Sequence, residues 1–156
     1  MPQAKKKHRS NPEWIKRHVT DPFVKRSVQE GFRSRAAYKL TEIADTDRLL
    51  KPGMVVVELG AAPGSWTQVV RKRLAGSDGK PRGRIIALDL LPMDPVPDVD
   101  FIQGDFRDEE VEAQLAARLG GAALAERVRR GGAESVGAVH LPRRDDPRPR
   151  ADGWRV

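Results

Sequence analysis

The spacing of apolar residues divides the chain into a helical N-terminal part and a part in which strands alternate with helices. Over residues 11–43 apolar residues recur every three or four positions, which is typical of amphipathic helices. Asn11-Pro12 and Asp21-Pro22 are helix-start signals, and Gly31 is a helix-end signal. The pattern predicts three helices, one from residue 11, one from residue 21 to Gly31 and one over 34–43. In the first helix we expect apolar contacts from Trp14, Ile15 and Val19, and in the second we expect Phe23, Val24 and Val28 to face inward. The third helix should place Ala36, Ala37, Leu40 and Ile43 on one face.

Short apolar runs follow these helices. Residues 54–59 and 84–89 are nearly continuous apolar runs, typical of strands that are buried on both faces of a parallel sheet. Residues 100–103 predict a shorter strand, and helices are predicted over 65–74 and 108–119. This alternation predicts an α/β fold, the start of a Rossmann-like, doubly wound sheet.

The regular pattern ends near residue 120. Residues 122–156 are rich in arginine and proline and contain no lysine, and only 135–139 predicts a weak strand, at the fourth position of the sheet. We expect residues 122–156 to be a disordered basic tail. Our hypothesis is that this tail is a frameshift product, because a GC-rich gene that is read out of frame yields such a composition. A natural basic tail that binds RNA is the alternative. A sheet cut after three strands would leave an unpaired apolar edge beside its first strand, and we expect such a fragment to aggregate.

Positive charge is concentrated at the N-terminus. Residues 1–35 contain ten Lys or Arg and three Asp or Glu, a net charge of +7, which equals the net charge of the whole chain. A basic arm on a nearly neutral domain is typical of nucleic-acid-binding proteins, because phosphates are bound by cations gathered at one surface. The alternative is a solvated tail that only aids solubility.

Composition excludes several other classes of protein. The chain has no cysteine, so it has no disulfides and no thiolate metal site. Its histidines, His8, His18 and His140, are scattered, and we expect no bound metal. No apolar run approaches the roughly 20 residues that a membrane-spanning helix needs. We therefore expect a cytoplasmic protein with no membrane partner.

A glycine loop lies between the predicted strand at 54–59 and the helix at 65–74. It begins at Gly60 and ends at Gly64, and such small residues let a ligand approach the backbone at a helix start. The loop has neither the G-x-G-x-x-G spacing of dinucleotide sites nor the G-x-x-x-x-G-K-[ST] spacing of phosphate loops. A ligand without a polyphosphate is therefore favoured.

Two carboxylates follow the next two strands. Asp89 ends the strand at 84–89, where a carboxylate can accept both hydroxyls of a ribose. Asp105 follows the strand at 100–103 and could accept a hydrogen bond from an adenine amino group. Together with the glycine loop, these residues suit S-adenosylmethionine. The alternatives are that they are ordinary turn and cap residues, or that the domain binds another adenosine ligand.

Four segments, taken in order, closely resemble the FtsJ-type family of bacterial enzymes that 2′-O-methylate a uridine of large-subunit ribosomal RNA. They are residues 31–40, 58–64, 89–95 and 100–106, and the likeness covers about residues 10 to 119. The chain departs from the family at Ser65, where a second glycine usually follows Gly64; serine also suits a helix start.

The resemblance implies transfer of a methyl group from S-adenosylmethionine to a ribose 2′-hydroxyl of ribosomal RNA, in the large subunit. It implies that Lys39 is the first member of the family's catalytic Lys-Asp-Lys-Glu set. The residues predicted to bind the cofactor are Gly60, Gly64, Trp66, Asp89 and Asp105. Trp66 could also be a packing aromatic beneath its helix. Arg33 and Arg35 are predicted to hold the phosphates that flank the target.

The division of the chain follows from this likeness. Residues 1–10 are expected to be a disordered basic arm, 11–121 the N-terminal part of a methyltransferase domain, and 122–156 the basic tail. The aspartate, second lysine and glutamate of the catalytic set have no counterpart in the sequence. A catalytically inactive RNA- or ribosome-binding fragment is therefore the alternative to an active enzyme.

Overall fold

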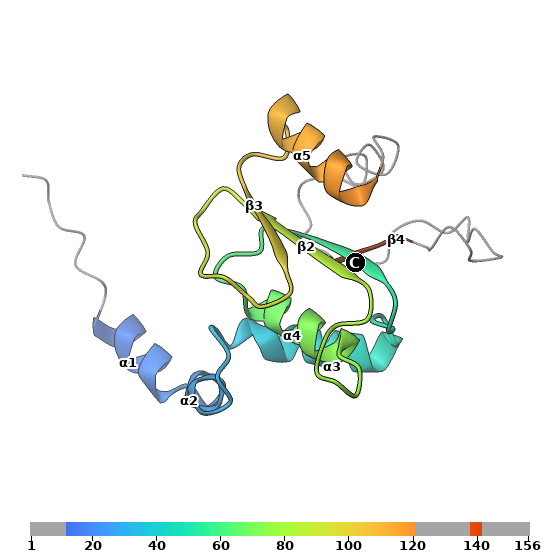
Figure 1. The fold of residues 1–156 in the computed structure, drawn as a ribbon. Helices are drawn as coiled ribbons and strands as arrows, with labels where there is room; N and C mark the ends of the chain where they lie inside the picture. The colour runs from blue at the N-terminus through green and yellow to red at the C-terminus, as the bar shows by residue number, and fades with distance from the viewer. Residues whose placement is uncertain (1–11, 121–137, 142–156) are drawn as a thin grey trace, which may run out of the picture.

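A four-stranded sheet with helices on both faces forms the body of the protein (Figure 1). The computed structural model describes residues 12–120 and 138–141. The elements are α1 (Pro12–Thr20), α2 (Pro22–Gln29), α3 (Ala36–Asp47), β1 (Val55–Leu59), α4 (Ser65–Leu74), β2 (Arg84–Asp89), β3 (Asp100–Gln103), α5 (Glu109–Leu119) and β4 (Ala138–Leu141). Strands β2 and β3 and helix α4 begin and end where the sequence predicted. Helix α3 extends four residues beyond its predicted end at residue 43.

The strand order is β3-β2-β1-β4. Strands β1, β2 and β3 are parallel, with Val55 beside Arg84 and Ile86 beside Asp100. The predicted α/β fold with a parallel sheet is therefore confirmed.

Strand β4 corrects three predictions about the C-terminal part. The strand lies beside β1, at the predicted fourth position, but it consists of residues 138–141 rather than 135–139. It runs antiparallel to β1 and pairs with it over four residues, so the predicted unpaired edge beside the first strand is wrong. Part of the predicted disordered tail thus forms a strand. The other residues of 122–156, and the predicted arm at 1–10, lie outside the described residues.

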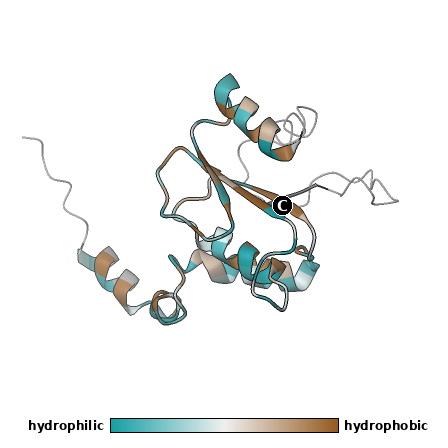
Figure 2. Ribbon diagram, in the orientation of Figure 1, coloured by the Kyte–Doolittle hydropathy of each residue, from teal (hydrophilic) through white to brown (hydrophobic). Residues whose placement is uncertain are grey.

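Each face of the sheet carries its own apolar cluster. On one face, Val69, Val70 and Leu74 of α4 and Ala37 and Leu40 of α3 pack against β1 and β2. On the other face, α5 covers the sheet through a second set of buried residues, Val111, Leu115 and Leu119. In Figure 2 the ribbon of the strands between these two layers is coloured mostly as hydrophobic. The sheet therefore holds the carboxyl ends of its parallel strands fixed at one edge.

The two N-terminal helices face differently from the prediction. Phe23 and Val28, which were expected to face inward, are 53% and 74% exposed, and the buried residue of α2 is Ser27. Ile15 and Val19 of α1 are also exposed. In Figure 1 both helices extend away from the sheet, and the ring of Phe23 contacts only the edge of this body, through the ring of Tyr38 in α3 among the described residues. The predicted inward face of α2 is therefore wrong for Phe23 and Val28, and the side chains predicted to supply the apolar contacts of α1, Ile15 and Val19, are exposed.

Gly83 lies directly before β2, where its backbone comes very close to the backbone of Met54, the residue that precedes β1. Its φ is +121°, and an added Cβ would lie 2.0 Å from the carbonyl oxygen of Met54. Gly83→Ala is expected to lower the free energy of unfolding by at least about 2 kcal/mol, from backbone displacement and left-handed strain together. Urea unfolding measures this change.

Gly79 provides the control. It also has a positive φ, +75°, but an added Cβ would meet nothing within 4 Å. Gly79→Ala should lower the free energy of unfolding by only about 1 kcal/mol, because only the strain of the left-handed conformation acts there. Equal destabilisation by the two substitutions would contradict the close contact with Met54.

Candidate functional site

The glycine loop folds against the end of β2. The N–H groups of Gly60 and Ala61 both donate hydrogen bonds to the carbonyl oxygen of Leu88, at 2.8 and 3.2 Å. Gly60 and Gly64 have φ angles of +75° and +104°, a region that favours glycine. Gly64 is the N-cap residue of α4. The two glycines thus allow the chain to leave β1, reach β2 and turn into α4 within five residues.

Asp89 joins three segments at the carboxyl edge of the sheet. Its Oδ2 accepts a hydrogen bond from the N–H of Ala62 in the glycine loop, and its Oδ1 accepts one from the N–H of Leu91, both at 2.8 Å. Its backbone carbonyl accepts from the N–H of Gly104, after β3, at 2.9 Å. Each carboxylate oxygen has two lone pairs, so each can accept a further hydrogen bond from a ligand hydroxyl.

Asp105 lies after β3 and is bound by Arg107. The backbone N–H of Arg107 donates to Oδ1 at 2.9 Å, and its guanidinium donates to both carboxylate oxygens. The Arg107 side chain holds the pKa of Asp105 well below its usual range, at about 2. Asp105 is therefore an ionised acceptor at neutral pH, and Gly104 places its segment beside Asp89.

Trp66 packs between α4 and α3. Its Nε1–H donates to the carbonyl oxygen of Ala36 at 2.8 Å, and its ring lies against the apolar cluster beneath the sheet. The packing interpretation of this residue is thus confirmed, while its contact with a cofactor stays a prediction.

Ser65, the departure from the family pattern, has a specific partner. It is buried, and its hydroxyl is hydrogen-bonded to the hydroxyl of Ser34 at 2.8 Å. The neighbouring segment is fixed as well, because Gln68 accepts from the N–H of Arg33 and donates to the carbonyl of Gly31. The segment that precedes α3 is therefore held along the first turns of α4.

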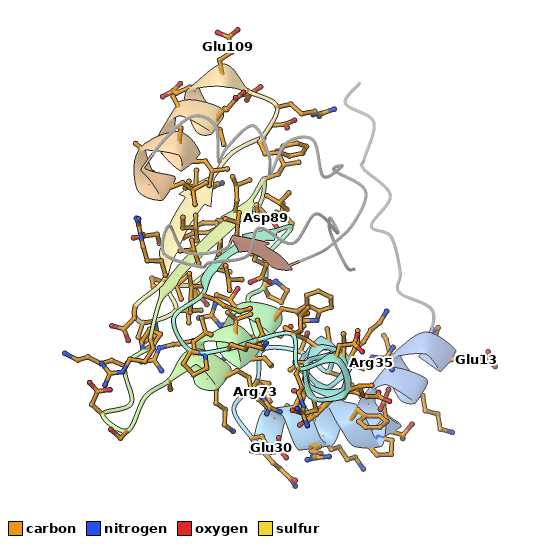
Figure 3. All side chains as sticks on the ribbon, turned by 90° about the vertical axis from the view of Figure 1, so that its right-hand side faces the viewer. Glu13, Glu30, Arg35, Arg73, Asp89 and Glu109 are labelled. Atoms are coloured by element: carbon orange, nitrogen blue, oxygen red, sulfur yellow. The ribbon has the colours of Figure 1, made fainter. Side chains whose placement is uncertain are left out.

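The two arginines predicted to bind RNA have different surroundings. The guanidinium of Arg33 donates hydrogen bonds to the carbonyl oxygens of Pro63, Asp94 and Pro95. Arg35 instead forms an exposed ion pair with Asp21, the N-cap residue of α2. Figure 3 labels Arg35 among the N-terminal helices, away from Asp89 at the end of β2.

Lys39 lies in α3 and is exposed. Its ammonium forms no hydrogen bond or ion pair with another residue in the described part of the chain. No such contact ties it to Asp89 or to the glycine loop. Its predicted catalytic role therefore rests on its place in the motif.

Glu58 is a residue of the site whose role the sequence did not predict. It is 1% exposed, in β1 directly before the glycine loop, and it accepts a hydrogen bond from the Thr67 hydroxyl at 2.6 Å. Burial raises the pKa of Glu58 to about 7, the charge of Asp89 adds to this rise, and the bond from Thr67 opposes it. An acidic residue inside an apolar strand was the available sequence signal. Glu58 and Thr67 connect β1 to α4 beneath the loop.

The raised pKa of Glu58 makes stability depend on pH. Below its ordinary pKa of 4.5 the carboxyl is protonated in both the folded and unfolded states. As the pH rises towards 7, the unfolded chain releases this proton while the folded protein retains it, so ionisation favours unfolding. The stabilisation present at low pH is thus lost as the pH rises through about 7.

Glu58→Gln is expected to remove this loss. Its free energy of unfolding relative to the unmodified chain should rise by about 3 kcal/mol between about pH 4.5 and pH 7.5. Urea unfolding at several pH values measures the difference. Glu109→Gln, at an exposed position of α5, is the control. A difference for Glu58→Gln that stays flat with pH would contradict the assignment.

The three parallel strands, with a glycine loop after β1 and carboxylates at the ends of β2 and β3, define a Rossmann-like domain. Residues 32–142 match the model of the FtsJ-like methyltransferase family, and the chain belongs to that family.

Curated relatives agree with this assignment. Ribosomal RNA large subunit methyltransferase E of Bordetella petrii is 59% identical over 118 residues, which cover 76% of this chain and 55% of that protein. The protein of the same name in Azoarcus sp. is 57% identical over 119 residues, 76% of this chain and 56% of that protein. The chain thus spans about half the length of the curated relatives that it matches.

One solved structure is also similar. It is a ribosomal RNA methyltransferase from Plasmodium falciparum, 35% identical, with a TM-score of 0.49, covering 56% of this chain and 49% of that one.

None of the helices in the described ranges is both long and apolar enough to span a membrane. Residues 12–120 and 138–141 contain no group of three or more His, Asp or Glu that could hold a metal ion.

Proposed function

We propose that this chain takes part in the S-adenosylmethionine-dependent 2′-O-methylation of a uridine ribose in large-subunit ribosomal RNA, in the cytoplasm. The observation that carries the proposal is the junction at Asp89, where one carboxylate joins the glycine loop to the end of β2. Relatives named as large-subunit ribosomal RNA methyltransferases support the substrate.

The residues present fit the cofactor. Asp89 keeps acceptor capacity for the two ribose hydroxyls, and ionised Asp105 can accept from the adenine amino group. Gly60 and Gly64 leave the loop without side chains at the two places where the backbone turns. The bound cofactor supplies a methyl group on a positively charged sulfur. The protein's own contribution is to hold the adenosine by its ribose and base.

The RNA side of the site is basic. A ribose hydroxyl is a poor nucleophile, and a nearby cation stabilises the negative charge that develops on its oxygen. Lys39 has an exposed ammonium with no partner among the described residues, as this role requires. Arg35 and the net charge of +7 on residues 1–35 supply cations for the flanking phosphates.

Transfer of tritium from methyl-labelled S-adenosylmethionine to undermethylated large subunits tests the proposal. Label in the RNA, released with 2′-O-methyluridine after digestion, is the expected result. Binding of the subunits without label would instead favour the inactive RNA-binding module for this chain. Calorimetry with S-adenosylmethionine and NAD tests the cofactor separately, and a preference for NAD would contradict the interpretation of the loop.

A further inference from the structure

Arg33 lies where the glycine loop meets the loop that follows β2. Its Nη1 donates to the carbonyl oxygen of Pro63 at 2.9 Å and to that of Asp94 at 2.6 Å. Its Nη2 donates to the carbonyl oxygen of Pro95 at 2.8 Å. One guanidinium therefore bridges residue 63 of the first loop and residues 94 and 95 of the second.

The backbone of Arg33 is itself anchored to α4. The Arg33 N–H donates to Oε1 of Gln68 at 2.9 Å, and Nε2 of Gln68 donates to the carbonyl of Gly31 at 3.0 Å. The segment that carries Arg33 is thus fixed to α4, the helix that begins directly after the glycine loop.

Gly64 gives independent support for this arrangement. An added Cβ at Gly64 would lie 2.6 Å from Nη1 of Arg33 and 2.8 Å from Sδ of Met93. The space that a side chain at position 64 would need is therefore filled by Arg33 and by Met93 of the second loop. Glycine at position 64 thus leaves the space that the arginine at position 33 occupies.

We propose that Arg33 is a positioning residue, which sets the spacing of loops 60–64 and 92–95 so that Asp89 and the glycine loop can hold the cofactor. The proposal rests on the proposed function. The positioning role and a phosphate-binding role make different demands on the side chain of Arg33. A phosphate contact needs mainly positive charge. A bridge between three carbonyl oxygens needs the planar fork of a guanidinium, which a lysine ammonium cannot reproduce.

Arg33→Lys and Arg33→Ala in the 156-residue chain separate these roles. Both variants are expected to raise the Kd for S-adenosylmethionine at least tenfold in calorimetry. Hydrogen exchange at the amides of Ala62 and Leu91, which donate to Asp89, should speed up at least tenfold, while exchange in β1 stays unchanged. Arg73→Ala, which removes an exposed ion pair with Asp45 at the other end of α4, should change neither.

Two results would overturn the assignment. One is cofactor binding by Arg33→Lys that equals that of the unmodified chain, because charge alone would then suffice. The other is unchanged exchange at Ala62 and Leu91 in both variants. If the unmodified chain bound no S-adenosylmethionine while both variants sped up exchange, the bridge would stand and the proposed function would fall.

Discussion

Asp89→Ala is expected to raise the Kd for S-adenosylmethionine by about a hundredfold. The substitution removes the carboxylate that we propose as the acceptor for two ribose hydroxyls, and hydrogen bonds to charged groups contribute about 1.5–3 kcal/mol each. It also leaves the N–H groups of Ala62 and Leu91 without their acceptor, so the glycine loop loses its tie to β2. Calorimetry measures the change.

Asp89→Asn is a sharper form of the same experiment. Because both carboxylate oxygens accept backbone N–H groups, the asparagine amide would turn an NH₂ group towards one of these donors. We therefore expect the near-isosteric variant to bind the cofactor almost as poorly as the alanine variant. Asp45→Ala, at an exposed carboxylate that pairs with Arg73, is the control. Unaltered affinity in Asp89→Asn would show that Asp89 does not bind the ribose.

Lys39→Ala is expected to lower methyl transfer by about a hundredfold or more at saturating cofactor, with a Kd for S-adenosylmethionine within about twofold of the original. General acid–base and electrostatic assistance of this kind contributes about 10²–10⁴-fold. Methyl incorporation should be measured in a version completed to the length of the relatives, because this chain spans about half of it.

Lys51→Ala removes another exposed lysine and is the matched control. The two predictions constrain each other: Asp89 variants should lose cofactor binding first, and the Lys39 variant should lose the chemical step first. If the Asp89 and Lys39 variants behaved alike, the division into a cofactor residue and a catalytic residue would be wrong.

Much of the fold could be predicted because local patterns determine it. The continuous apolar runs of β1 and β2 differ from the helical spacing of apolar residues in α4, and glycines mark the turns between these elements. The residues at which the strands and the helix begin and end could therefore be predicted from the local sequence. The inward faces of α1 and α2 could not be predicted in the same way. Apolar spacing shows that a helix has an apolar face, but whether another layer covers Phe23 and Val28 depends on tertiary packing.

The site divides along similar lines. Asp89 and Asp105 follow predicted strands, and parallel strands bring such positions to one edge, so their closeness was predictable. The surroundings of Arg33 were not, because its carbonyl partners lie 30 to 62 positions away and carry no side-chain signature. Ser65 shows the same limit, since Ser34, the partner of this buried hydroxyl, lies 31 positions earlier.

The position of β4 has a consequence for the order in which the sheet forms. Strand β1 pairs with β2 across a single intervening helix, whereas its pairing with β4 joins Val55 to Leu141, near opposite ends of the sheet-forming chain. Closing the longer loop costs more chain entropy, so we expect β1, β2 and β3 to associate first and β4 to join last. During synthesis the glycine loop, Asp89 and the segment held along α4 are complete before β4 leaves the exit tunnel. The edge that carries the glycine loop and Asp89 is thus built before the sheet acquires its final strand.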